Sequence, residues 1–403
     1  MRSERLWTMS EFAEAGVRVL DCEHKTPPDA GCGHPYVAIP NLVDGRLDLT
    51  NVRRITDEDL REWTRRTRPR GGDVIVTRRG RVGDSAVVPE GLDCAIGQNL
   101  VILRSDETHV DQRFLRWAAR GPLWAEEVNR LRNVGAVFDS LNVRDLARIR
   151  VPTPPMGEQR AIAAVLGTLD DKIDSNRRLA VLLEETGSMK FRAQFFDTTV
   201  AWAEGTLSDL VDITMGQSPP GSSYTEDDDA GVLLVQGMGG FGDRYPSSDV
   251  YTTVPTRRAP PGSTLMTVRA PVGAVNVART EVCLGRGVAG IRSKHPAFAE
   301  FLVRGLSSRW ASEESGTIFP AVNRKQVLGL PVQRPPGAEI EAFERFASPI
   351  VSTLATLHDE TEALTAIRDA LLPELISGEI RVPDTADPEE VIGPAAEDAA
   401  ATV

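Results

Sequence analysis

The chain has 403 residues, of which 41% are hydrophobic and 26% charged, and its formal net charge is −12. This length can bury a full core and predicts two or three domains rather than one. The sequence lacks a run of the roughly 18 to 20 apolar residues that a bilayer span requires, and its opening MRSERLWTMSEF lacks the apolar segment of a secretory signal. Four scattered cysteines are too few for a disulfide framework. We therefore expect a globular, cytoplasmic protein with reduced thiols.

The negative charge is distributed unevenly along the chain. Residues 1–150 hold 24 basic and 23 acidic residues, and residues 206–336 hold 13 and 12, whereas residues 337–372 and 373–403 are strongly acidic. Attraction to phosphates depends on local patches within a Debye length of about 10 Å. The net charge therefore does not exclude a nucleic acid as partner.

Short β-rich runs separated by Gly and Pro turns, such as DVIVTRR, fill the first 150 residues and precede a helical segment, VDQRFLRWAARGPLWAEEVNRL. This pattern predicts an α+β module. In the same module, Cys22, His24, Cys32 and His34 form a C-x-H…C-x-H pattern that contains enough ligands for tetrahedral zinc. The spacing is not that of a common zinc finger, and the second half of the chain does not repeat it, so we predict no metal site.

A long amphipathic helix is predicted to begin directly after Pro154 and Pro155. Its apolar positions step by fours and threes from Ile162 to Leu183, which is the pattern of a coiled-coil seam. The helix would contain about 35 to 40 residues and measure about 55 to 60 Å.

Shifting the sequence by 181 residues brings this helix back. The stretch LNVRDLARIRVPTPPMGEQRAIAAVLGTLDDKI aligns with VNRKQVLGLPVQRPPGAEIEAFERFASPIVSTL, which places Asn142 on Asn323 and Pro154 on Pro335. Further upstream, GGDVIVTRRGRVGDSAVV aligns with PGSTLMTVRAPVGAVNVA. Because such self-similarity indicates a duplicated architecture, we predict the order domain, helix, domain, helix.

Two apolar stripes of this length would be large exposed patches if they stayed unpaired. We therefore predict that the two helices pack against each other; the alternative is that each stripe packs on its neighbouring domain. The residues predicted to pair the helices are Ile162, Leu166, Leu169, Ile173, Leu183, Phe343, Ile350, Leu354, Leu357 and Leu364.

Basic and amide side chains gather around the repeated β-rich runs. Arginine suits both phosphates and guanine edges, and the amides of Gln98 and Asn99 suit adenine. The alternatives are a solvated basic face and ordinary polar turn residues. Arg79 and Arg269 occupy equivalent positions in the two halves. The residues predicted to bind DNA are Lys25, Arg78, Arg79, Arg81, Gln98, Asn99, Arg257, Arg258, Arg269 and Arg286.

Signatures of catalysis are weak in this sequence. GMGGFG at residues 237–242 formally fits G-x-G-x-x-G, but the following DRYPSSDV does not open a helix, so a Gly-rich turn is favoured over a dinucleotide site. TEDDDAG at residue 225 lacks the spaced Glu of a calcium loop. A P-loop and a nucleophile elbow are missing as well. We predict no catalytic residues.

Several motifs, in order over nearly the whole chain, resemble the specificity subunit of Type I restriction-modification systems. They are DCEHKTPP, VPTPPMGEQRAIAAVLGTLDDKI, TLMTVRAPVGAV, CLGRGVAGIRS and IRDALLPELISGEI. The resemblance implies an α+β fold in which two tandem, pseudo-twofold-related α/β target-recognition domains are separated by two long helices that form an antiparallel coiled coil. The second helix lacks the pair found at Glu158-Gln159, and we expect this to weaken the symmetry of the docking surface.

The same resemblance implies a non-catalytic DNA reader of a bipartite, asymmetric target. Its helices would dock two modification subunits that methylate adenine, and restriction/translocase subunits would join them. We expect S-adenosylmethionine, ATP and Mg on these partners only, and no cofactor on this chain. The alternatives are a coiled-coil scaffold that does not bind DNA, a stand-alone DNA-binding protein and an enzyme with an unfamiliar site. The predicted regions are 1–153 and 200–334 (recognition domains), 154–199 and 335–380 (conserved helical regions) and 381–403 (an acidic tail with the composition of disorder).

Overall fold

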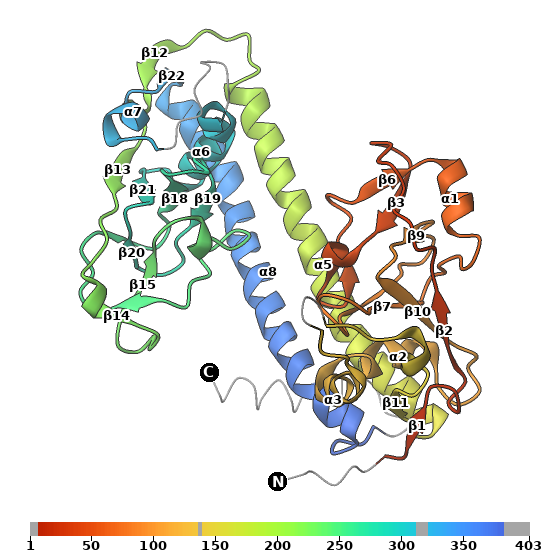
Figure 1. Cartoon of the computed structure of the whole chain (residues 1–403). Coiled ribbons are helices and arrows are strands. Elements are labelled where there is room, and N and C mark those ends of the chain that lie inside the picture. The colour runs from red at the N-terminus through yellow and green to blue at the C-terminus, as the bar shows by residue number, and fades with distance from the viewer. Residues whose placement is uncertain (1–6, 136–138, 312–320, 383–403) are drawn as a thin grey trace. The chain divides into compact units, whose positions relative to one another are not determined.

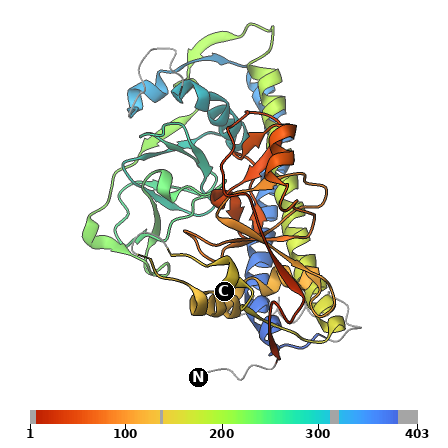
Figure 2. The same cartoon turned by 45° about the vertical axis from the view of Figure 1, so that its right-hand side comes forward.

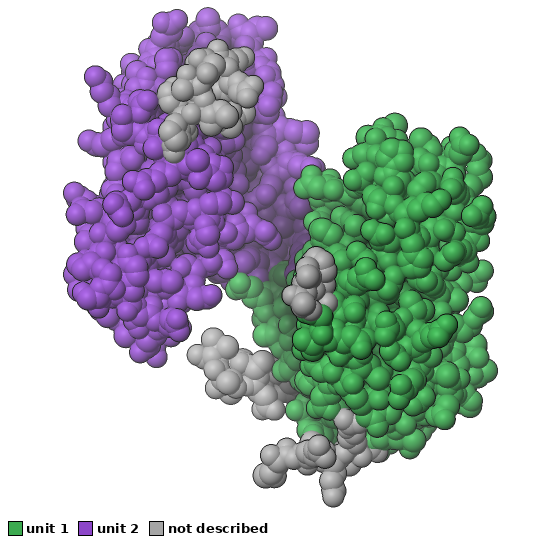
Figure 3. Space-filling view, in the orientation of Figure 1, with its two compact units in different colours: residues 1–175, 360–403 green, residues 176–359 purple. Residues whose placement is uncertain are grey.

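The computed structural model describes residues 7–135, 139–311 and 321–382. The chain divides into two compact units, residues 1–175 with 360–403 (unit 1) and residues 176–359 (unit 2), which Figure 3 shows in green and purple. Each unit contains one β-rich domain and part of each of two long helices (Figure 1). Among the described residues, none of the helices combines the length and the apolar composition needed to cross a membrane.

Unit 1 is built on a four-stranded antiparallel sheet of order β2-β10-β7-β8. These strands span Val17–Asp21 (β2), Leu100–Ser105 (β10), Val74–Thr77 (β7) and Ser85–Val87 (β8). The first four residues of β10 are all fully buried. A strand covered on both faces reads as a continuous apolar run rather than as an alternating one, which explains the sequence LVIL.

Helices cover one face of this sheet, and smaller strands cover the other. Phe114 and Trp124 from the helices pack with Val76 of β7, whereas Ile75 of the same strand packs with Val37. The smaller strands on the second face are β4 (Leu42–Val43) with β5 (Arg46–Leu47), and β6 (Arg53–Ile55), β3 (His34–Val37) and β9 (Ala95–Ile96) in one sheet. β1 (Met9–Glu11) pairs with β11 (Arg150–Pro152), whose Val151 lies in the core on the helix side. The helices on the first face are α2 (Gln112–Ala118), α3 (Gly121–Leu131) and α4 (Val143–Leu146), whereas α1 (Asp57–Trp63) packs against β3, β6 and β9.

Unit 2 repeats this plan. Its four-stranded antiparallel sheet has the order β13-β21-β18-β19, with Asp212–Met215 (β13), Val288–Arg292 (β21), Thr264–Thr267 (β18) and Val275–Val277 (β19). A five-stranded sheet contains β14 (Tyr224–Thr225), β16 (Tyr251–Thr252), β15 (Val232–Val235), β20 (Val282–Leu284) and β17 (Arg258–Ala259). β12 (Ala203–Thr206) pairs with β22 (Pro331–Arg334), and the helices are α6 (Pro296–Ala311) and α7 (Arg324–Leu328).

The duplication extends to individual strand pairs and turns. β15 runs parallel to β20 as β3 runs parallel to β9. The turns after β7 and β18 each contain a glycine with left-handed backbone, Gly83 at φ 93° and Gly273 at φ 94°, a conformation that side chains other than hydrogen disfavour. The predicted α+β class, with two tandem domains and two long helices, is confirmed.

The long helices are α5 (Met156–Phe195) and α8 (Gly337–Ser377), and each begins directly after a proline pair. In unit 1 the first turns of α5 share a core with the last turns of α8, for example Leu166 with Leu371. In unit 2 the last turns of α5 meet the first turns of α8, where the rings of Phe191 and Phe343 lie 5.2 Å apart. Both pairings are therefore antiparallel, and Figures 1 and 2 show the two helices side by side.

Charged residues fasten the unit 1 domain to the helices. Asp170 of α5 is 2% exposed and accepts hydrogen bonds from Arg116 of α2 and, at 2.9 Å, from Arg368 of α8. Arg46 of β5 lies 2.8 Å from the same carboxylate. One buried carboxylate thus joins the domain to both helices.

The chain ends of unit 1 lie against the start of α5. The Arg381 guanidinium donates to Glu158 at 2.6 and 2.8 Å and stacks 4.2 Å from the ring centroid of Trp7. Val382 is fully buried. Arg381 and Val382, which the sequence placed in the acidic tail, therefore pack on the domain because an ion pair and an apolar contact hold them. The rest of that predicted tail, residues 383–403, lies outside the described residues.

Candidate nucleic-acid interface

Several strands of unit 1 end at one edge of its β-structure. β2 and β7 end at Asp21 and Thr77, which pair with the first residues of β10. β3 and β9 end beside them, because the Gly97 N–H after β9 donates to the Val37 carbonyl of β3 at 2.8 Å. We call this edge of unit 1 edge 1 and define it by the polar residues that directly follow or precede its strands. Edge 1 contains His24, Lys25, Arg78, Arg79, Gln98 and Asn99.

Unit 2 has the equivalent edge. β13 and β18 end where β21 begins, since Met215 pairs with Ala289 and Thr267 with Val288. The Gly285 N–H after β20 donates to the Val235 carbonyl of β15 at 2.8 Å. Edge 2 contains Gln217, Ser218, Gln236, Arg257, Arg269 and Arg286. The structure therefore brings eight of the ten predicted DNA-binding residues to two equivalent edges, and Arg81 and Arg258 are the two that belong to neither.

The basic residues near edge 1 differ in how far the domain already uses them. Arg78 is half-buried and donates to the Gln98 carbonyl at 3.0 Å and to His24 Nδ1 at 3.4 Å. Arg81 donates to the carbonyls of Ile39 and Leu42 at 2.6 and 2.9 Å. Lys25 and Arg79 are exposed, and within the described residues their side chains have no hydrogen bond or ion pair in the structure. The side chains of Arg79 and Lys25 are therefore available to a ligand, whereas that of Arg81 already bonds backbone carbonyls within the domain.

Gln98 and Asn99 border a hollow of about 290 Å³ at edge 1. Asn41, Asn51 and Arg53 also line it. Arg53 donates to the Pro27 carbonyl at 2.8 Å, and Asn41 bonds to the backbone of Ala38. Nothing in the sequence pattern indicates Asn41, Asn51 or Arg53, because only the folded path of residues 38–53 brings them next to Gln98.

The basic residues near edge 2 also fall into two groups. Arg258 is ion-paired with Glu281 beside β20, so its charge is partly satisfied within the domain. Arg257 and Arg269 are exposed, and neither side chain has a hydrogen bond or ion pair within the part of the chain that the structure describes. Arg286 is exposed and donates through Nε to the Ser218 hydroxyl at 3.2 Å.

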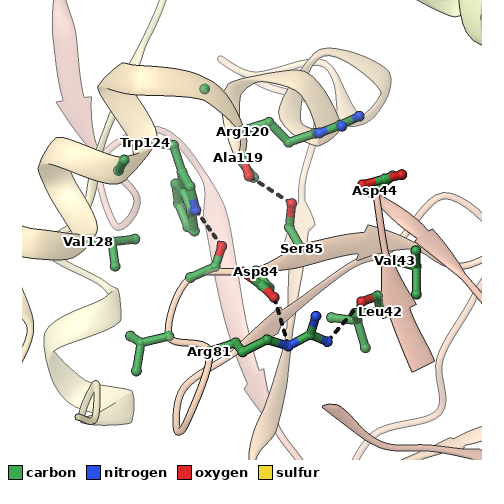
Figure 4. Close-up of a pocket in the computed structure, with 15 residues that line it drawn as sticks. Leu42, Val43, Asp44, Arg81, Asp84, Ser85, Ala119, Arg120, Trp124 and Val128 are labelled. Carbon is green, nitrogen blue, oxygen red and sulfur yellow. Dashed lines mark hydrogen bonds and ion pairs between the residues drawn. The ribbon is translucent and has the colours of Figure 1, made fainter. Parts of the chain in front are cut away.

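A second hollow of unit 1, of about 430 Å³, lies between α3 and the β4–β5 turn (Figure 4). Most of its polar groups already have partners. Trp124 Nε1 donates to the Gly83 carbonyl at 2.7 Å, Ser85 Oγ donates to the Ala119 carbonyl at 2.8 Å, and Arg81 pairs with Asp84. The bonds of Trp124 and Ser85 hold α3 and the turn before it against the sheet, so the hollow is part of the scaffold.

The cysteine–histidine pattern does not form one metal site. His34 Nε2 lies 2.7 Å from Asp57, and Cys32 is exposed. Within the described residues, Cys22 and His24 do lie close together with Asp21. Burial raises the pKa of Cys22 to about 11, and its thiol donates to the Gly97 and Leu100 carbonyls at 3.1 and 3.3 Å. A protonated, bonded thiol is a poor metal ligand.

The residues predicted to pair the helices are buried to different extents. Ile162, Leu166, Leu169 and Ile173 of α5 are at most 1% exposed, as is Phe343 of α8, whereas Ile350, Leu354 and Leu357 are between 2% and 9% exposed. Leu183 and Leu364 are half-buried. Asn176, which interrupts the apolar pattern, is 2% exposed.

Glu158 and Gln159 do not form an exposed docking surface. Gln159 is fully buried: it accepts from the Asp111 N–H at 2.8 Å and donates to the His109 and Pro154 carbonyls at 2.8 Å. Glu158 is 7% exposed and bonds Arg381. Both side chains are therefore used within unit 1, Gln159 by the loop before α2 and Glu158 by Arg381, and the expected asymmetry of the docking surface stays a prediction.

The comparisons with known proteins agree with one another. A family model for the Type I restriction modification DNA specificity domain matches residues 28–185. The putative type I restriction enzyme MjaX specificity subunit of Methanocaldococcus jannaschii is 27% identical over 380 residues, covering 87% of this chain and 88% of that protein. The type I restriction enzyme EcoBI specificity subunit of Escherichia coli is 26% identical over 176 residues, 42% of this chain and 36% of that one.

A solved structure shares the fold. The crystal structure of the Type-I restriction-modification system S subunit from M. genitalium matches 93% of this chain and 97% of its own, with a TM-score of 0.61 and 15% identity. The matching family model describes a DNA specificity domain and not a catalytic one. Residues 28–185 thus match the Type I restriction modification DNA specificity domain, and the chain as a whole is similar to Type I restriction enzyme specificity subunits over most of its length.

Proposed function

We propose that the chain reads a bipartite, asymmetric DNA target and holds the modification subunits of a Type I restriction-modification complex. One observation carries the proposal. Two domains with the same strand order present polar and basic side chains at the same edge, but the side chains differ, with Gln98 and Asn99 in unit 1 where unit 2 has Arg286 and Gly287. Equal scaffolds with unequal side chains suit two unequal half-sites.

The charge distribution supports contact with the DNA backbone as well. Arg79 and Arg269 follow equivalent strands, are exposed, and have backbones that pair with Ser140 and Ala321 respectively. Such arginines neutralise phosphates and fix the position of a domain on a duplex without reading sequence. Base recognition then falls to the neighbouring amide and guanidinium groups.

The helices are proposed to dock the partners. Leu179, Leu182 and Met189 of α5 are 44%, 59% and 63% exposed, and exposed apolar groups along one helix suit a protein partner. In this proposal two modification subunits bind S-adenosylmethionine, restriction/translocase subunits bind ATP and Mg, and this chain binds no cofactor. The complex would act on DNA in the cytoplasm.

Methylome sequencing of a host that carries this gene with its partner genes tests the proposal. We expect one bipartite motif with an unspecified gap. Arg18 and Arg292 provide matched controls, because both are exposed arginines at the opposite end of the sheets from edges 1 and 2. Substituting either by alanine should leave the motif unchanged. A continuous, gapless motif would contradict the proposal.

A mobility-shift assay of the assembled complex separates this function from a scaffold that does not bind DNA. A reader should bind its own motif 10³-fold or more tighter than random duplex, within the usual range for specific binding. Weak, sequence-independent binding with a steep salt dependence would instead favour the scaffold.

The long helices are proposed to set the distance between the half-sites. Deleting seven residues, about two turns, from both α5 and α8 should shorten the gap in the methylated motif and leave each half-site unchanged. Altered half-sites with an unchanged gap would rule this out.

A further inference from the structure

We propose that one loop tip in each domain reads a base: Gln98 and Asn99, between β9 and β10, read an adenine in one half-site, and Arg286, between β20 and β21, reads a guanine in the other. The inference rests on the proposed function and adds the base class to it. Both tips lie at the edges defined above, in loops of the same length between equivalent strands.

The two tips have the same backbone. The Leu100 N–H donates to the Gly97 carbonyl at 2.9 Å, and the Val288 N–H donates to the Gly285 carbonyl at 3.0 Å. The Asn99 carbonyl accepts from Arg78 at 2.9 Å, as the Gly287 carbonyl accepts from Val268 at 2.8 Å. Together with the Gly97 and Gly285 bonds described above, these contacts hold each tip at three points. Gln98 and Arg286 therefore leave the backbone from equivalent positions.

The amides of Gln98 and Asn99 are available to a ligand. Gln98 is exposed and Asn99 half-buried. Only their backbone carbonyls take part in the hydrogen bonds with Arg78; within the described part of the chain, neither side-chain amide has a hydrogen bond in the structure. A primary amide carries a donor and an acceptor side by side, which matches the N6 donor and N7 acceptor of adenine in the major groove.

The arginines beside this tip are less suited to read a base. The Arg81 guanidinium donates to the Ile39 and Leu42 carbonyls and pairs with Asp84. Arg78 holds the tip through the Gln98 carbonyl. Arg79 is exposed and unpaired within the described residues, but it follows β7 and is assigned above to the phosphates. The amides are thus the uncommitted, bidentate groups of the tip itself, and this favours adenine over guanine.

Unit 2 reverses this situation. The Arg286 Nε is oriented by the Ser218 hydroxyl at 3.2 Å, which leaves the terminal nitrogens to bind O6 and N7 of guanine. A side chain at Gly287 is excluded, because a Cβ there would lie 2.4 Å from the Gln236 carbonyl oxygen. The amide pair of unit 1 therefore has no counterpart in unit 2, and Arg286 acts alone at its tip.

Selection of bound duplexes from a random library by the purified, assembled complex, at fixed salt, tests both assignments without requiring methylation. Substituting both Gln98 and Asn99 by alanine should make one adenine of one half-site degenerate, with a loss of discrimination on the order of ten- to a hundredfold. Arg286→Ala should do the same to one guanine of the other half-site. Each variant should leave the opposite half-site unchanged.

Arg18→Ala and Arg292→Ala serve as matched controls, and Arg286→Gln keeps a polar side chain if Arg286→Ala fails to assemble. We expect Arg286→Gln to lose the guanine preference as well. The inference is overturned if the affected bases are not adenine and guanine, or if the motif stays intact in the variants. In those cases the unaltered complex still selects a bipartite motif, whereas failure of the proposed function would show as a gapless motif or none.

Discussion

Unit 1 and unit 2 share their strand order and the backbone bonds of their loop tips, yet they are fastened to the long helices by different chemistry. In unit 1 the fastening is ionic, with Asp170 between arginines of the domain and of α8. In unit 2 aromatic rings are added to ion pairs: Phe343 of α8 lies among phenylalanines of α5 and α6, while Arg244 pairs with Glu184 of α5 and Arg279 with Asp359 of α8. The difference teaches that the backbone pattern defines the domain, whereas any chemistry that excludes water can anchor it.

The side chains of the long helices that bond the starts of α2 and α6 also differ between the units. Gln159, in the first turn of α5, bonds the backbone of the loop before α2. In unit 2 Glu344 of α8 accepts from the N–H groups of Ala297 and Phe298, in the first turn of α6. A carboxylate is favourable at a helix N-terminus. Glu344, one turn further along α8 than the position equivalent to Gln159, therefore takes the role that the Gln159 amide has in unit 1.

The largest effect is expected at the aromatic anchor. Phe343→Ala removes a ring that is 1% exposed and lies 5.2 to 5.7 Å from the rings of Phe191, Phe195 and Phe301. It should lower the free energy of unfolding of unit 2 by about 3–5 kcal/mol. Compared with the unaltered chain, hydrogen exchange in the variant should become faster in peptides of unit 2 and change less in peptides of unit 1. Phe346→Ala, at a ring that is 38% exposed, is the control and should have a much smaller effect.

The ionic anchor should respond next. Asp170→Ala leaves three arginines around an empty, buried position and should cost about 3 kcal/mol, at the low end for a broken buried ion pair, since Arg46 and Arg116 remain partly exposed. Exchange should rise in unit 1 rather than in unit 2. Removing a surface pair, with Lys172→Ala opposite Glu360, should cost less than about 1 kcal/mol. Equal losses for the two variants would contradict the buried anchor.

Two glycines of α5 sharpen the comparison. A Cβ at Gly187, in unit 2, would lie 2.2 Å from the ring of Phe301, whereas a Cβ at Gly167, in unit 1, would meet nothing within 4 Å. Gly187→Ala should destabilise unit 2 by about 1–3 kcal/mol through overpacking. Gly167→Ala should stabilise unit 1 by up to about 1 kcal/mol through helix propensity. Thermal unfolding of both variants should therefore shift in opposite directions.

Acid should weaken unit 1 through a carboxylate of α3. Burial alone would raise the pKa of Glu127, but hydrogen bonds from Arg150 and Arg130 outweigh it and lower the pKa to about 2, from an ordinary value of 4.5. The stabilisation is therefore fully present above about pH 4.5 and is lost as the pH falls toward 2. Glu127→Gln should flatten the pH dependence of unit 1 stability in this window. If unit 1 of Glu127→Gln lost as much stability in acid as unit 1 of the unaltered chain, measured by hydrogen exchange, this coupling would be contradicted.

The smallest effect is expected for the two equivalent arginines. Arg79→Ala and Arg269→Ala should each weaken DNA binding on all sequences alike and reduce the slope of log affinity against log salt by about 1. The two variants should match each other because the exposed side chains leave equivalent strands. A salt slope that changes for only one of them would show that the two domains meet the duplex differently.

The duplicated fold was predictable because its signals are local. Hydrophobic periodicity and the paired prolines indicated α5 and α8, and apolar runs between glycines indicated β7 and β18. The anchors were not predictable. Asp170 bonds Arg116 and Arg368, which are 54 and 198 positions away, and a single sequence does not indicate pairs at such separations.

The types of residue in the candidate site were predictable, but which of them are already bonded within the domain was not. Arginines and amides near the strand ends could be identified as suitable for DNA. Only the structure distinguishes Arg81, which bonds carbonyls 39 and 42 positions away, from Arg79, which remains exposed. Backbone acceptors are the same for every residue type, so the sequence contains no sign of them.

The loop tips are held mainly through their backbones, and the side chains at the tips add only the bond from Arg286 to the Ser218 hydroxyl. Substitutions at Gln98 or Arg286 therefore leave the supports of the tip intact, and the cost in folding should be slight. Under the proposed function, a point mutation at a tip would change one base of the target at a time while the domain stays folded. Such a protein can acquire new sequence preferences gradually, without passing through unfolded intermediates.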